Sequence, residues 1–479
     1  MFMDGAAPAP ARRAIEQDFP RLAGRRRAAQ ELGELRAWAR RFADNEIAPR
    51  ALELDARAEL DPATVDQEIV RRGAIYGLLN LMVPRPAGGR GALAVDTAIV
   101  MEELCAACPG IALIFGAHAL GMAPLLAVGG IAHWDGVLRD TVKAAQRGEP
   151  ELMAFAITEP DAGTDVEDPD LLRRGRVASA AREVSGGYRL NGVKRFISNG
   201  SVARWITTFM PLDRSRPAET MTCFLVDTRT PGFSVSGAEH KLGQRACPAA
   251  ELVYEDVFVP ADMVVGRPGD GMAATMIVLA TSRSPVGAIA TGIAAGAYRR
   301  LLTWLQEDPK GTKLLAEQHV QLELARMEEE IHLARQAYLD AATELDVVAL
   351  GGALRHPAVR LAGALPHAVR ARGPLRRAFT SPRARDATAA LLRRTTDDAR
   401  MTRALALASL AKAHGGDVAM RVTSAALDIA GLDAGPVRAE LQKLWRDAKL
   451  TQIYEGTNQL NRLEVYRGLC RGERLEMLP

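Results

Sequence analysis

One carboxylate near the end of the chain interrupts an otherwise helical pattern. In the stretch "TQIYEGTNQ", Glu455 follows Tyr454 and precedes Gly456, with apolar-periodic sequence on both sides. The helix before it is expected to end near Tyr454, and Thr457 is a suitable N-cap for the helix expected next. A carboxylate on so short a break is held in place, and burial beside apolar groups would raise its pKa toward neutrality. These properties suit a general base, although a glutamate in a helix break, taken alone, is more often a solvated surface residue.

A second stretch able to do chemistry follows the apolar run "LMAFAIT" and reads "TEPDAGTD", from Thr158 to Asp165. The chain is expected to turn at Gly163 and to expose backbone amides together with the hydroxyls of Thr158 and Thr164. Such a loop can hydrogen-bond the polar edge of a planar ligand without adding charge. Taken alone, the pattern is more typical of a turn that caps a strand.

A third stretch, "GVKRFISNGS", predicts a strand that presents an aromatic ring beside a hydroxyl. Phe196 and Ser198 lie two residues apart, so they are expected on one face of that strand. This face could pack the ring against a planar ligand and offer the hydroxyl to its edge. An aromatic residue in a sheet core is the alternative interpretation.

The elements that must position these residues change type twice along the chain. Helical spacing of apolar residues from about 28 to 148 gives way to short β-rich runs from about 152 to 262, and helical spacing returns from about 268. The order predicts an α+β fold with an N-terminal helical domain, a central β-barrel-like domain and a C-terminal helical bundle. The predicted boundaries are an extension at 1–27, helices at 28–150, the β domain at 151–265 and the C-terminal helices at 266–479. No G-x-G-x-x-G follows a strand, so a Rossmann nucleotide site is not predicted.

Composition excludes several classes of function. The net charge of +3 argues against a general nucleic-acid or membrane-surface binder. Five scattered cysteines suit a reducing compartment, and a cytoplasmic location is expected. Cys105 and Cys108 form a single CxxC without a second pair, so buried thiols are favoured over a metal site. The apolar stretch from Gly110 to Ala132 contains several glycines and a proline, and it is predicted to be buried core helix rather than a membrane span.

Four motifs in one order resemble the acyl-CoA dehydrogenase family. Besides "TEPDAGTD" and "GVKRFISNGS", they are "LGQRACPAAELVYEDVFVP" with the Gly-rich segment after it, and "RDAKLTQIYEGTNQLNR". The resemblance covers roughly residues 28–345 and 400–475, which is most of the chain. One such motif could arise by chance, whereas four in register identify the chain as similar to this family.

The resemblance implies an FAD enzyme that oxidises an acyl-CoA thioester, with Glu455 as the catalytic base. In the family this glutamate abstracts the α-proton while the β-hydrogen leaves as hydride to flavin N5. The glutamate's own backbone amide helps to stabilise the enolate-like transition state. Electrons then pass to an electron-transfer flavoprotein, and the enzymes are mostly dimers or tetramers, so a homo-oligomer is expected and a hetero-oligomer is possible.

Further site residues are implied by position in the matched motifs. The cofactor-binding set is Phe155, Ile157, Thr158, Thr164, Phe196, Ile197, Ser198, Gln318, Gly431, Thr457 and Gln459. The substrate-binding set is Thr164, Arg283, Tyr454 and Gly456. Relatives usually carry tryptophan and threonine where this chain has Phe196 and Ser198. Arg283 resembles an arginine that follows an alternative base position in isovaleryl-type relatives, but Ser282 occupies that position here, which favours Glu455 as the base.

Two departures concern the pyrophosphate of the cofactor. Glu307 stands where the family often has an arginine, and a carboxylate there would repel phosphate. The usual Gly-Gly-x-Gly turn reads Gly431-Leu432-Asp433-Ala434, in which Leu432 and Ala434 crowd the approach. In the family both elements serve a neighbouring subunit's cofactor.

An arginine-rich insertion at about 348–398 interrupts the C-terminal resemblance. Its stretch from Arg355 to Arg394 contains ten arginines, no lysine, and one acid, Asp386. A solvated insertion is one interpretation. A cationic surface for a phosphate-bearing ligand is the other, with Arg376 and Arg377 as candidate contacts.

Three functions therefore remain open at this point. The leading one is FAD-dependent α,β-dehydrogenation of an acyl-CoA. A flavin oxidase or monooxygenase on the same fold is the second. The third is a degenerate, non-catalytic or half-site subunit of a heteromeric complex.

Overall fold

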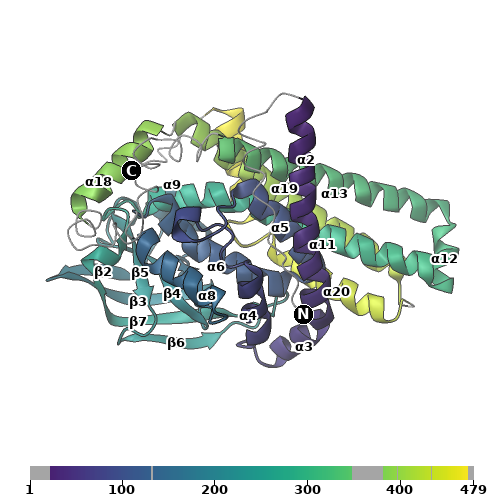
Figure 1. The fold of residues 1–479 in the computed structure, drawn as a ribbon, viewed down its shortest axis with the longest axis horizontal. Helices are drawn as coiled ribbons and strands as arrows, with labels where there is room; N and C mark the ends of the chain where they lie inside the picture. The colour runs from purple at the N-terminus through teal and green to yellow at the C-terminus, as the bar shows by residue number, and fades with distance from the viewer. Residues whose placement is uncertain (1–21, 131–132, 348–380, 396–397, 433, 473–479) are drawn as a thin grey trace.

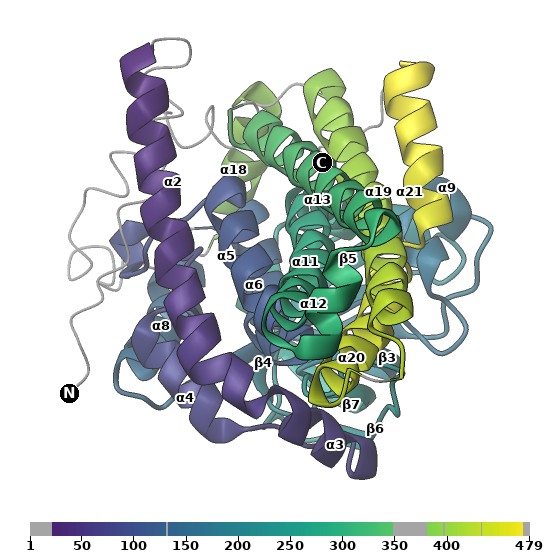
Figure 2. The ribbon, with the colours of Figure 1, turned by 90° about the vertical axis from the view of Figure 1, so that its right-hand side faces the viewer.

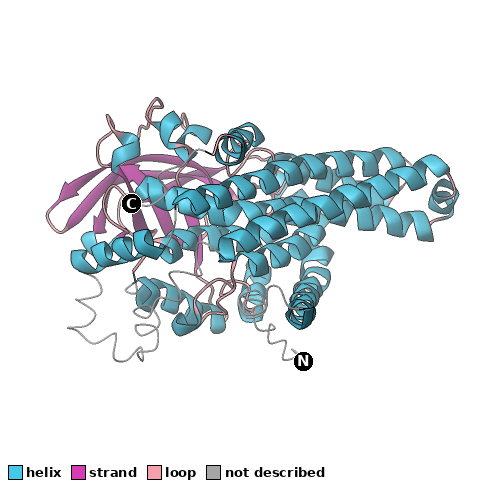
Figure 3. Cartoon of the chain, turned by 90° about the horizontal axis from the view of Figure 1, so that it is seen from above, coloured by secondary structure: helices cyan, strands magenta, loops and turns pink. Residues whose placement is uncertain are grey.

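A computed structural model describes residues 22–130, 133–347, 381–395, 398–432 and 434–472. Helices come first, two β-sheets follow, and long helices complete the chain (Figure 1). The sheets lie together at one end of the molecule, and the long C-terminal helices extend away from them (Figure 3). This order confirms the predicted α+β class. Residues 348–380, which include Arg376 and Arg377, lie outside the described part, so the phosphate-contact hypothesis stays a prediction.

The N-terminal part is a set of helices whose apolar faces meet around α5 and α6. Buried side chains from these helices belong to the same hydrophobic cluster as the C-terminal helices. The longest of them, α2, crosses the outside of the bundle (Figure 2). The helices of the N-terminal part are α2 (Leu22–Phe42), α3 (Ala51–Leu60), α4 (Gln67–Tyr76), α5 (Ala94–Ala107), α6 (Pro109–Ala127) and α8 (Arg139–Gln146).

The central part consists of two four-stranded sheets in the orders β1-β4-β5-β8 and β2-β3-β7-β6. A separate apolar cluster takes side chains from both sheets, so they pack face to face through a shared core. Only the β1–β4 pair is parallel among the described strand pairs. The strands are β1 (Leu152–Ala156), β2 (Ala180–Val184), β3 (Gly187–Ser198), β4 (Ala203–Pro211), β5 (Met221–Asp227), β6 (Phe233–Ala238), β7 (Ala249–Pro260) and β8 (Val264–Val265).

The C-terminal part is built around α11, which packs against α5, α13, α19 and α20. Small residues let it approach its neighbours closely. A Cβ on Gly292 would lie 2.2 Å from the Glu102 carbonyl oxygen, and one on Gly296 would lie 2.3 Å from that of Ala106. Any larger residue would therefore push α5 and α11 apart. The helices are α11 (Gly271–Glu307), α12 (Pro309–Leu315), α13 (Gln318–Leu345), α18 (Pro382–Thr395), α19 (Asp398–Ala430), α20 (Pro436–Leu450) and α21 (Asn458–Val465).

Two described helices, α6 and α11, are long and apolar enough to cross a membrane by length and composition. Most of each apolar window is buried inside the protein, 67% for α6 and 83% for α11. The predicted core helix within 110–132 corresponds to α6. Both helices contribute to the main apolar cluster, as core helices do.

Buried charges fasten α2 and α13 to α5. The Glu102 carboxylate, fully buried, accepts hydrogen bonds from Arg335 at 2.7 Å and Arg36 at 3.3 Å, and from the hydroxyl of Tyr338. Its neighbour Glu103 accepts from Arg36 at 3.0 Å. These pairs join helices that are far apart in the sequence, because the cations on α2 and α13 share acids on one turn of α5.

Removing the charge of Glu102 is expected to destabilise the fold. Glu102→Gln leaves Arg335 partly buried without its carboxylate and takes one of two carboxylates from Arg36, which costs about 3 kcal/mol by analogy with other broken buried pairs. Urea denaturation measures the loss as a lower midpoint. Glu68→Gln, which breaks the exposed pairs with Arg71 and Arg72, is the control and should leave the midpoint unchanged. Equal midpoints for Glu102→Gln and wild type would contradict the assignment.

Candidate active site

The break around Glu455 is a turn with two successive left-handed residues. Glu455 has φ 57° and Gly456 has φ 78°. The preceding helix ends at Leu450, four residues before the predicted end near Tyr454, because turn hydrogen bonds replace the helical pattern from Thr451 onward. Thr457 caps the next helix as predicted, since its hydroxyl accepts from the Leu460 amide at 3.3 Å.

The Glu455 carboxylate is held by a hydroxyl from α11. Ser282 donates to Oε2 of Glu455 at 2.6 Å. Burial raises the pKa of Glu455, while the Ser282 hydrogen bond and the charges of Arg283 and Lys412 partly oppose that rise. The net direction is upward, so this carboxyl holds a proton to a higher pH than an exposed glutamate does. The sequence-based expectation for a base in this position has the same direction.

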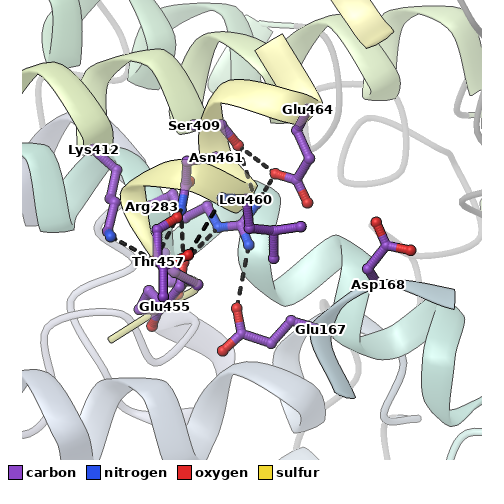
Figure 4. Close-up of polar contacts among 12 residues, drawn as sticks. Glu167, Asp168, Arg283, Ser409, Lys412, Glu455, Thr457, Leu460, Asn461 and Glu464 are labelled. Atoms are coloured by element: carbon purple, nitrogen blue, oxygen red, sulfur yellow. Dashed lines mark hydrogen bonds and ion pairs between the residues drawn. The ribbon is translucent and has the colours of Figure 1, made fainter. Parts of the chain in front are cut away.

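Arg283 lies beneath the break as a fully buried cation with several protein partners (Figure 4). Its Nε donates to the Glu455 carbonyl oxygen at 3.0 Å, and its Nη1 donates to the Ser409 hydroxyl at 3.0 Å and to the Glu464 carboxylate. Its Nη2 donates to Glu167 at 3.3 Å. Each nitrogen is thus engaged within the protein. In this structure Arg283 supports the Glu455 backbone, and its predicted contact with substrate stays a prediction.

A second buried cation, Lys412 on α19, holds the carbonyl of Gly456. Its Nζ donates to that oxygen at 2.5 Å and to Oδ1 of Asn458 at 2.9 Å. Burial and the nearby Arg283 charge lower the pKa of Lys412 to about 7. The side-chain amide of Asn461 donates to the same Gly456 oxygen at 2.9 Å. The backbone after Glu455 is therefore fixed from two helices.

Tyr454 is fixed from the β domain. The side-chain amide of Gln244 donates to its hydroxyl at 3.3 Å and to the Asp447 carbonyl oxygen at 2.9 Å. Lys443 in turn donates to the Asp447 carboxylate at 2.6 Å, and both of these side chains are buried. Burial raises the pKa of the Tyr454 hydroxyl, which stays protonated. Gly456 lies buried beside this segment, whereas Gln459 is exposed on α21.

The Thr158 loop is anchored by a buried ion pair. Lys194 on β3 donates to Glu159 at 2.8 Å and to the Ile157 carbonyl oxygen at 2.9 Å. The Arg195 amide donates to the Thr158 carbonyl oxygen at 2.9 Å, which ties the loop to the strand. The amides of Glu159 and Ala162 bond each other's carbonyls, so these two are not exposed as predicted. The side chains of Thr158 and Thr164 remain partly exposed, as predicted.

The strand beside this loop carries an exposed aromatic ring. Phe196 has φ 60° at an irregularity of the β3–β7 pairing, and its side chain is 55% exposed. The guanidinium of Arg195 lies 5.1 Å from the ring centroid. Ser198 is partly exposed and Ile197 is buried, so β3 still alternates despite the bulge. The alternative of an aromatic in the sheet core is excluded for Phe196.

These residues fit the planar cofactor that the resemblance implies. An exposed phenyl ring on β3 and partly exposed hydroxyls at Thr158, Thr164 and Ser198 offer an apolar face with polar edges. Ile157 and Ile197 are buried, so they can contribute backbone groups more readily than side chains. Phe155 is partly buried against Phe209, with ring centroids 4.9 Å apart.

Not all predicted residues come together in this one chain. Gln318 begins α13 and Gly431 follows α19, whereas the Thr158 loop adjoins the β domain. The turns next to α12 and α20 lie at the end of the bundle remote from the sheets (Figures 1 and 2). These two residues therefore lie away from Glu455, and Glu307 and Leu432 are exposed near them.

Several residues at the site were not singled out in the sequence. Glu167 follows "TEPDAGTD" by two positions, and its side chain, 12% exposed, reaches Arg283. Burial and then the charges of Glu455 and Glu464 raise its pKa to about 7, against the lowering effect of Arg283. Within the described part of the chain no group of three metal-ligating side chains is found. The other residues that the sequence did not reveal as site residues are Gln244, Ser409, Lys412, Asn461 and Glu464.

Comparison with known protein families accounts for three consecutive parts of the chain. Residues 29–142 match the acyl-CoA dehydrogenase N-terminal domain, and residues 154–257 match the middle domain. Residues 269–356 and 381–470 match the C-terminal domain, so the middle of the arginine-rich insertion, residues 357–380, falls in the gap between these two segments.

Individual relatives agree over most of the chain. A cyclohex-1-ene-1-carbonyl-CoA dehydrogenase of Syntrophus aciditrophicus is 32% identical over 90% of this chain and 87% of its own length. A probable acyl-CoA dehydrogenase FadE25 of Mycobacterium tuberculosis is 28% identical over 92% and 96%. The butyryl-CoA dehydrogenase structure from Megasphaera elsdenii has a TM-score of 0.71 and 26% identity over 92% of this chain and 98% of that one.

The close packing around Gly456 can be tested by one substitution. A Cβ there would lie 2.9 Å from Oε2 of Glu167 and 3.0 Å from Nη2 of Arg283. Gly456→Ala is therefore expected to destabilise the protein by about 2 kcal/mol or more, through the left-handed φ and the displaced ion pair. Gly186→Ala is the matched control, since Gly186 has φ 82° and open space around it. Thermal unfolding should show the larger loss at Gly456, and equal losses would contradict the packing argument.

Proposed function

The chain belongs to the acyl-CoA dehydrogenase family, and we propose that it dehydrogenates an acyl-CoA thioester to the 2,3-enoyl-CoA with Glu455 as the base. As a member of this family it is an FAD-dependent oxidoreductase acting on CH–CH groups. The observation that carries the proposal is the carboxylate of Glu455, fixed by Ser282 at 2.6 Å in a rigid break beside the Thr158 loop. A flavin monooxygenase, which removes no α-proton, would not require this arrangement.

The surroundings of Glu455 suit the removal of a weakly acidic α-proton. Partial burial raises the affinity of the carboxylate for a proton, and the Ser282 hydroxyl orients one of its oxygens. The other oxygen makes no hydrogen bond with any described residue, so it is available to accept the proton. A positioned base of this kind contributes roughly 10²–10⁴-fold to a rate.

The backbone around Glu455 supplies a second element of catalysis. Among the described residues, none accepts a hydrogen bond from the Glu455 amide, while its carbonyl is fixed by Arg283 at 3.0 Å and Asn461 at 3.3 Å. A held amide without an internal acceptor is suited to donate to the thioester carbonyl oxygen as negative charge develops there. One such preorganised donor is worth about 3 kcal/mol in other enzymes.

The cofactor is proposed to lie between the Thr158 loop and the β3 residues. Bound there, FAD supplies the two-electron acceptor for the hydrogen that leaves the β-carbon as hydride. Phe196 would pack against its ring, and Thr158, Thr164 and Ser198 would hydrogen-bond its polar edge. Thr457, next to the base, would contact it from the other side.

A homo-oligomeric assembly is proposed from the positions of Gln318 and Gly431. Both lie at the end of the helical bundle remote from the Thr158 loop, so they can reach a cofactor only in another copy of the chain. We further propose a dimer or tetramer in the cytoplasm that passes electrons to an electron-transfer flavoprotein.

A half-site subunit is the second candidate, favoured by two exposed side chains at that end of the bundle. Leu432 is 86% exposed and Glu307 is also exposed, where relatives place groups that receive pyrophosphate. A hetero-oligomer would then provide the missing contacts. Flavin content per chain of the purified protein separates the candidates, since a half-site subunit would lack flavin without a homologous partner.

The dehydrogenase proposal predicts a yellow protein whose flavin is bleached anaerobically by an acyl-CoA. Titration with a panel of acyl-CoAs of different chain length and branching tests this directly. Glu455→Gln is expected to retain the flavin absorbance. Its flavin should bleach about 10³-fold more slowly than that of the wild type, because the base is gone. Turnover that survives this substitution would exclude Glu455 as the base.

The pH dependence of bleaching should report the Glu455 carboxyl. Because burial raises its pKa, the rate should be full above that raised value and fall with acid at a higher pH than an exposed glutamate would require. Ser282→Ala removes a hydrogen bond to the ionised Glu455 carboxylate. The acid limb of the pH–rate profile, where the rate falls as Glu455 takes up a proton, should therefore move to higher pH. Thr281→Ala is the control, since that hydroxyl bonds the Val278 carbonyl oxygen instead. A limb that stays in place in Ser282→Ala would contradict the assignment.

A further inference from the structure

One carboxylate at the site has no part in the mechanism so far. Glu167 ends the short helical turn after Thr164, and its carboxylate points at the Arg283 guanidinium (Figure 4). It is close enough to the break that a Cβ on Gly456 would lie 2.9 Å from its Oε2. Glu167 therefore lies on the far side of Arg283 from the Glu464 carboxylate.

The charges around Arg283 do not balance if every group is ionised. Three carboxylates (Glu167, Glu455 and Glu464) face two cations (Arg283 and Lys412), and all five side chains are buried or partly buried. Glu464 and Ser409 already engage Nη1 of Arg283, and Glu167 engages Nη2. The positive charge of Arg283 also lowers the pKa of Glu455, which makes that carboxylate a weaker base.

We propose that Glu167 is a positioning residue that offsets the charge of Arg283 and thereby keeps Glu455 strongly basic. The inference rests on the proposed role of Glu455. When Glu167 is ionised, it shares the guanidinium charge with Glu464, so less of that charge weakens the base. The charged and titratable groups that face Glu167 come from four elements: Arg283 on α11, Lys412 on α19, Glu455 in the break and Glu464 on α21.

The position of Glu167 also joins the two halves of the site. It belongs to the same loop as Thr158 and Thr164, and through Arg283 it contacts the carbonyl of the catalytic glutamate. Coupling between Glu167 and Glu455 is reciprocal, so a proton on one makes the other easier to ionise. Burial raises the pKa of Glu167 to about 7, so its charge changes with pH near neutrality.

The adjacent residue provides a matched control. Asp168 carries the same charge, is also buried, and pairs with Arg467 at 2.6 Å. It caps the turn that follows by accepting from the amides of Asp170 and Leu171. Its carboxylate lies apart from the Arg283 cluster (Figure 4). Asp168→Asn thus removes one negative charge and one tie from the same loop without changing the neighbours of Arg283.

The test compares the anaerobic flavin-reduction rate of the FAD-loaded protein across pH. Glu167→Gln is expected to lower the rate about 10-fold at pH 8, to move the acid limb to lower pH and to leave the acyl-CoA dissociation constant unchanged, because a lower Glu455 pKa makes a weaker base. Glu167→Asp should recover most of the rate. Asp168→Asn should leave both the rate and the position of the acid limb unchanged. An unshifted limb in Glu167→Gln, or an equal shift in Asp168→Asn, would overturn the inference.

A second measurement does not depend on turnover. Infrared titration of the carboxyl groups, with Glu455→Gln to assign the band, gives the ionisation of Glu455 directly. The Glu455 band should titrate at lower pH in Glu167→Gln than in wild type, and Glu167→Asp should lie between them. If no acyl-CoA bleaches the wild-type flavin, the dehydrogenase proposal fails while this titration still decides the role of Glu167. A Glu455 band that titrates identically in all three proteins would overturn it.

Discussion

The site depends on a buried guanidinium that must be matched by protein groups. An arginine removed from water is costly unless its charge and its donors are satisfied, and Arg283 is completely buried. Its partners come from the Thr164 turn, the Glu455 break, α19 and α21, which are distant in the sequence. Satisfying one side chain therefore requires these segments to meet. The break acquires its defined shape because one of the required acceptors is the carbonyl of Glu455.

A second buried ion pair fixes the Thr158 loop against strand β3. Glu159 and Lys194 are both nearly inaccessible, and the lysine also bonds the Ile157 carbonyl oxygen. The pair fixes the Thr158 loop against β3, so that the hydroxyl-bearing loop and the exposed ring of Phe196 keep one relative position. Because Glu167 ends the segment that Glu159 begins, the two ion pairs fix the Thr158 loop and the Glu455 break relative to each other.

Local sequence signals predicted the parts of this site that depend on local structure. The alternation of helical and β-rich zones, the cap at Thr457 and the isolation of Glu455 in a break could all be recognised from neighbouring residues. The family resemblance gave the domain order. Glu167 and Glu464 could not be found in this way, because a glutamate on a turn or an amphipathic helix is usually solvated, and only tertiary packing brings these two to Arg283. The helix end was placed too late for a different reason, since the turn from Thr451 onward keeps local hydrogen bonds, such as that from the Thr451 amide to the Ala448 carbonyl oxygen, and its apolar pattern does not distinguish it from helix.

The backbone conformation at Glu455 and Gly456 explains why the break has an acid followed by a glycine. A left-handed φ at a residue with a side chain costs about 1 kcal/mol, and glycine would avoid that cost. Glycine cannot supply a carboxylate, so a glutamate at this position retains the strained conformation. The next residue is also left-handed, and there the lack of space for a Cβ beside Glu167 and Arg283 requires glycine. A hydrogen bond from Arg283 to the Glu455 carbonyl oxygen offsets the strain. Hydrogen bonds from Lys412 and Asn461 to the Gly456 carbonyl oxygen do the same. The order of acid then glycine is thus set jointly by chemistry at one position and by packing at the other.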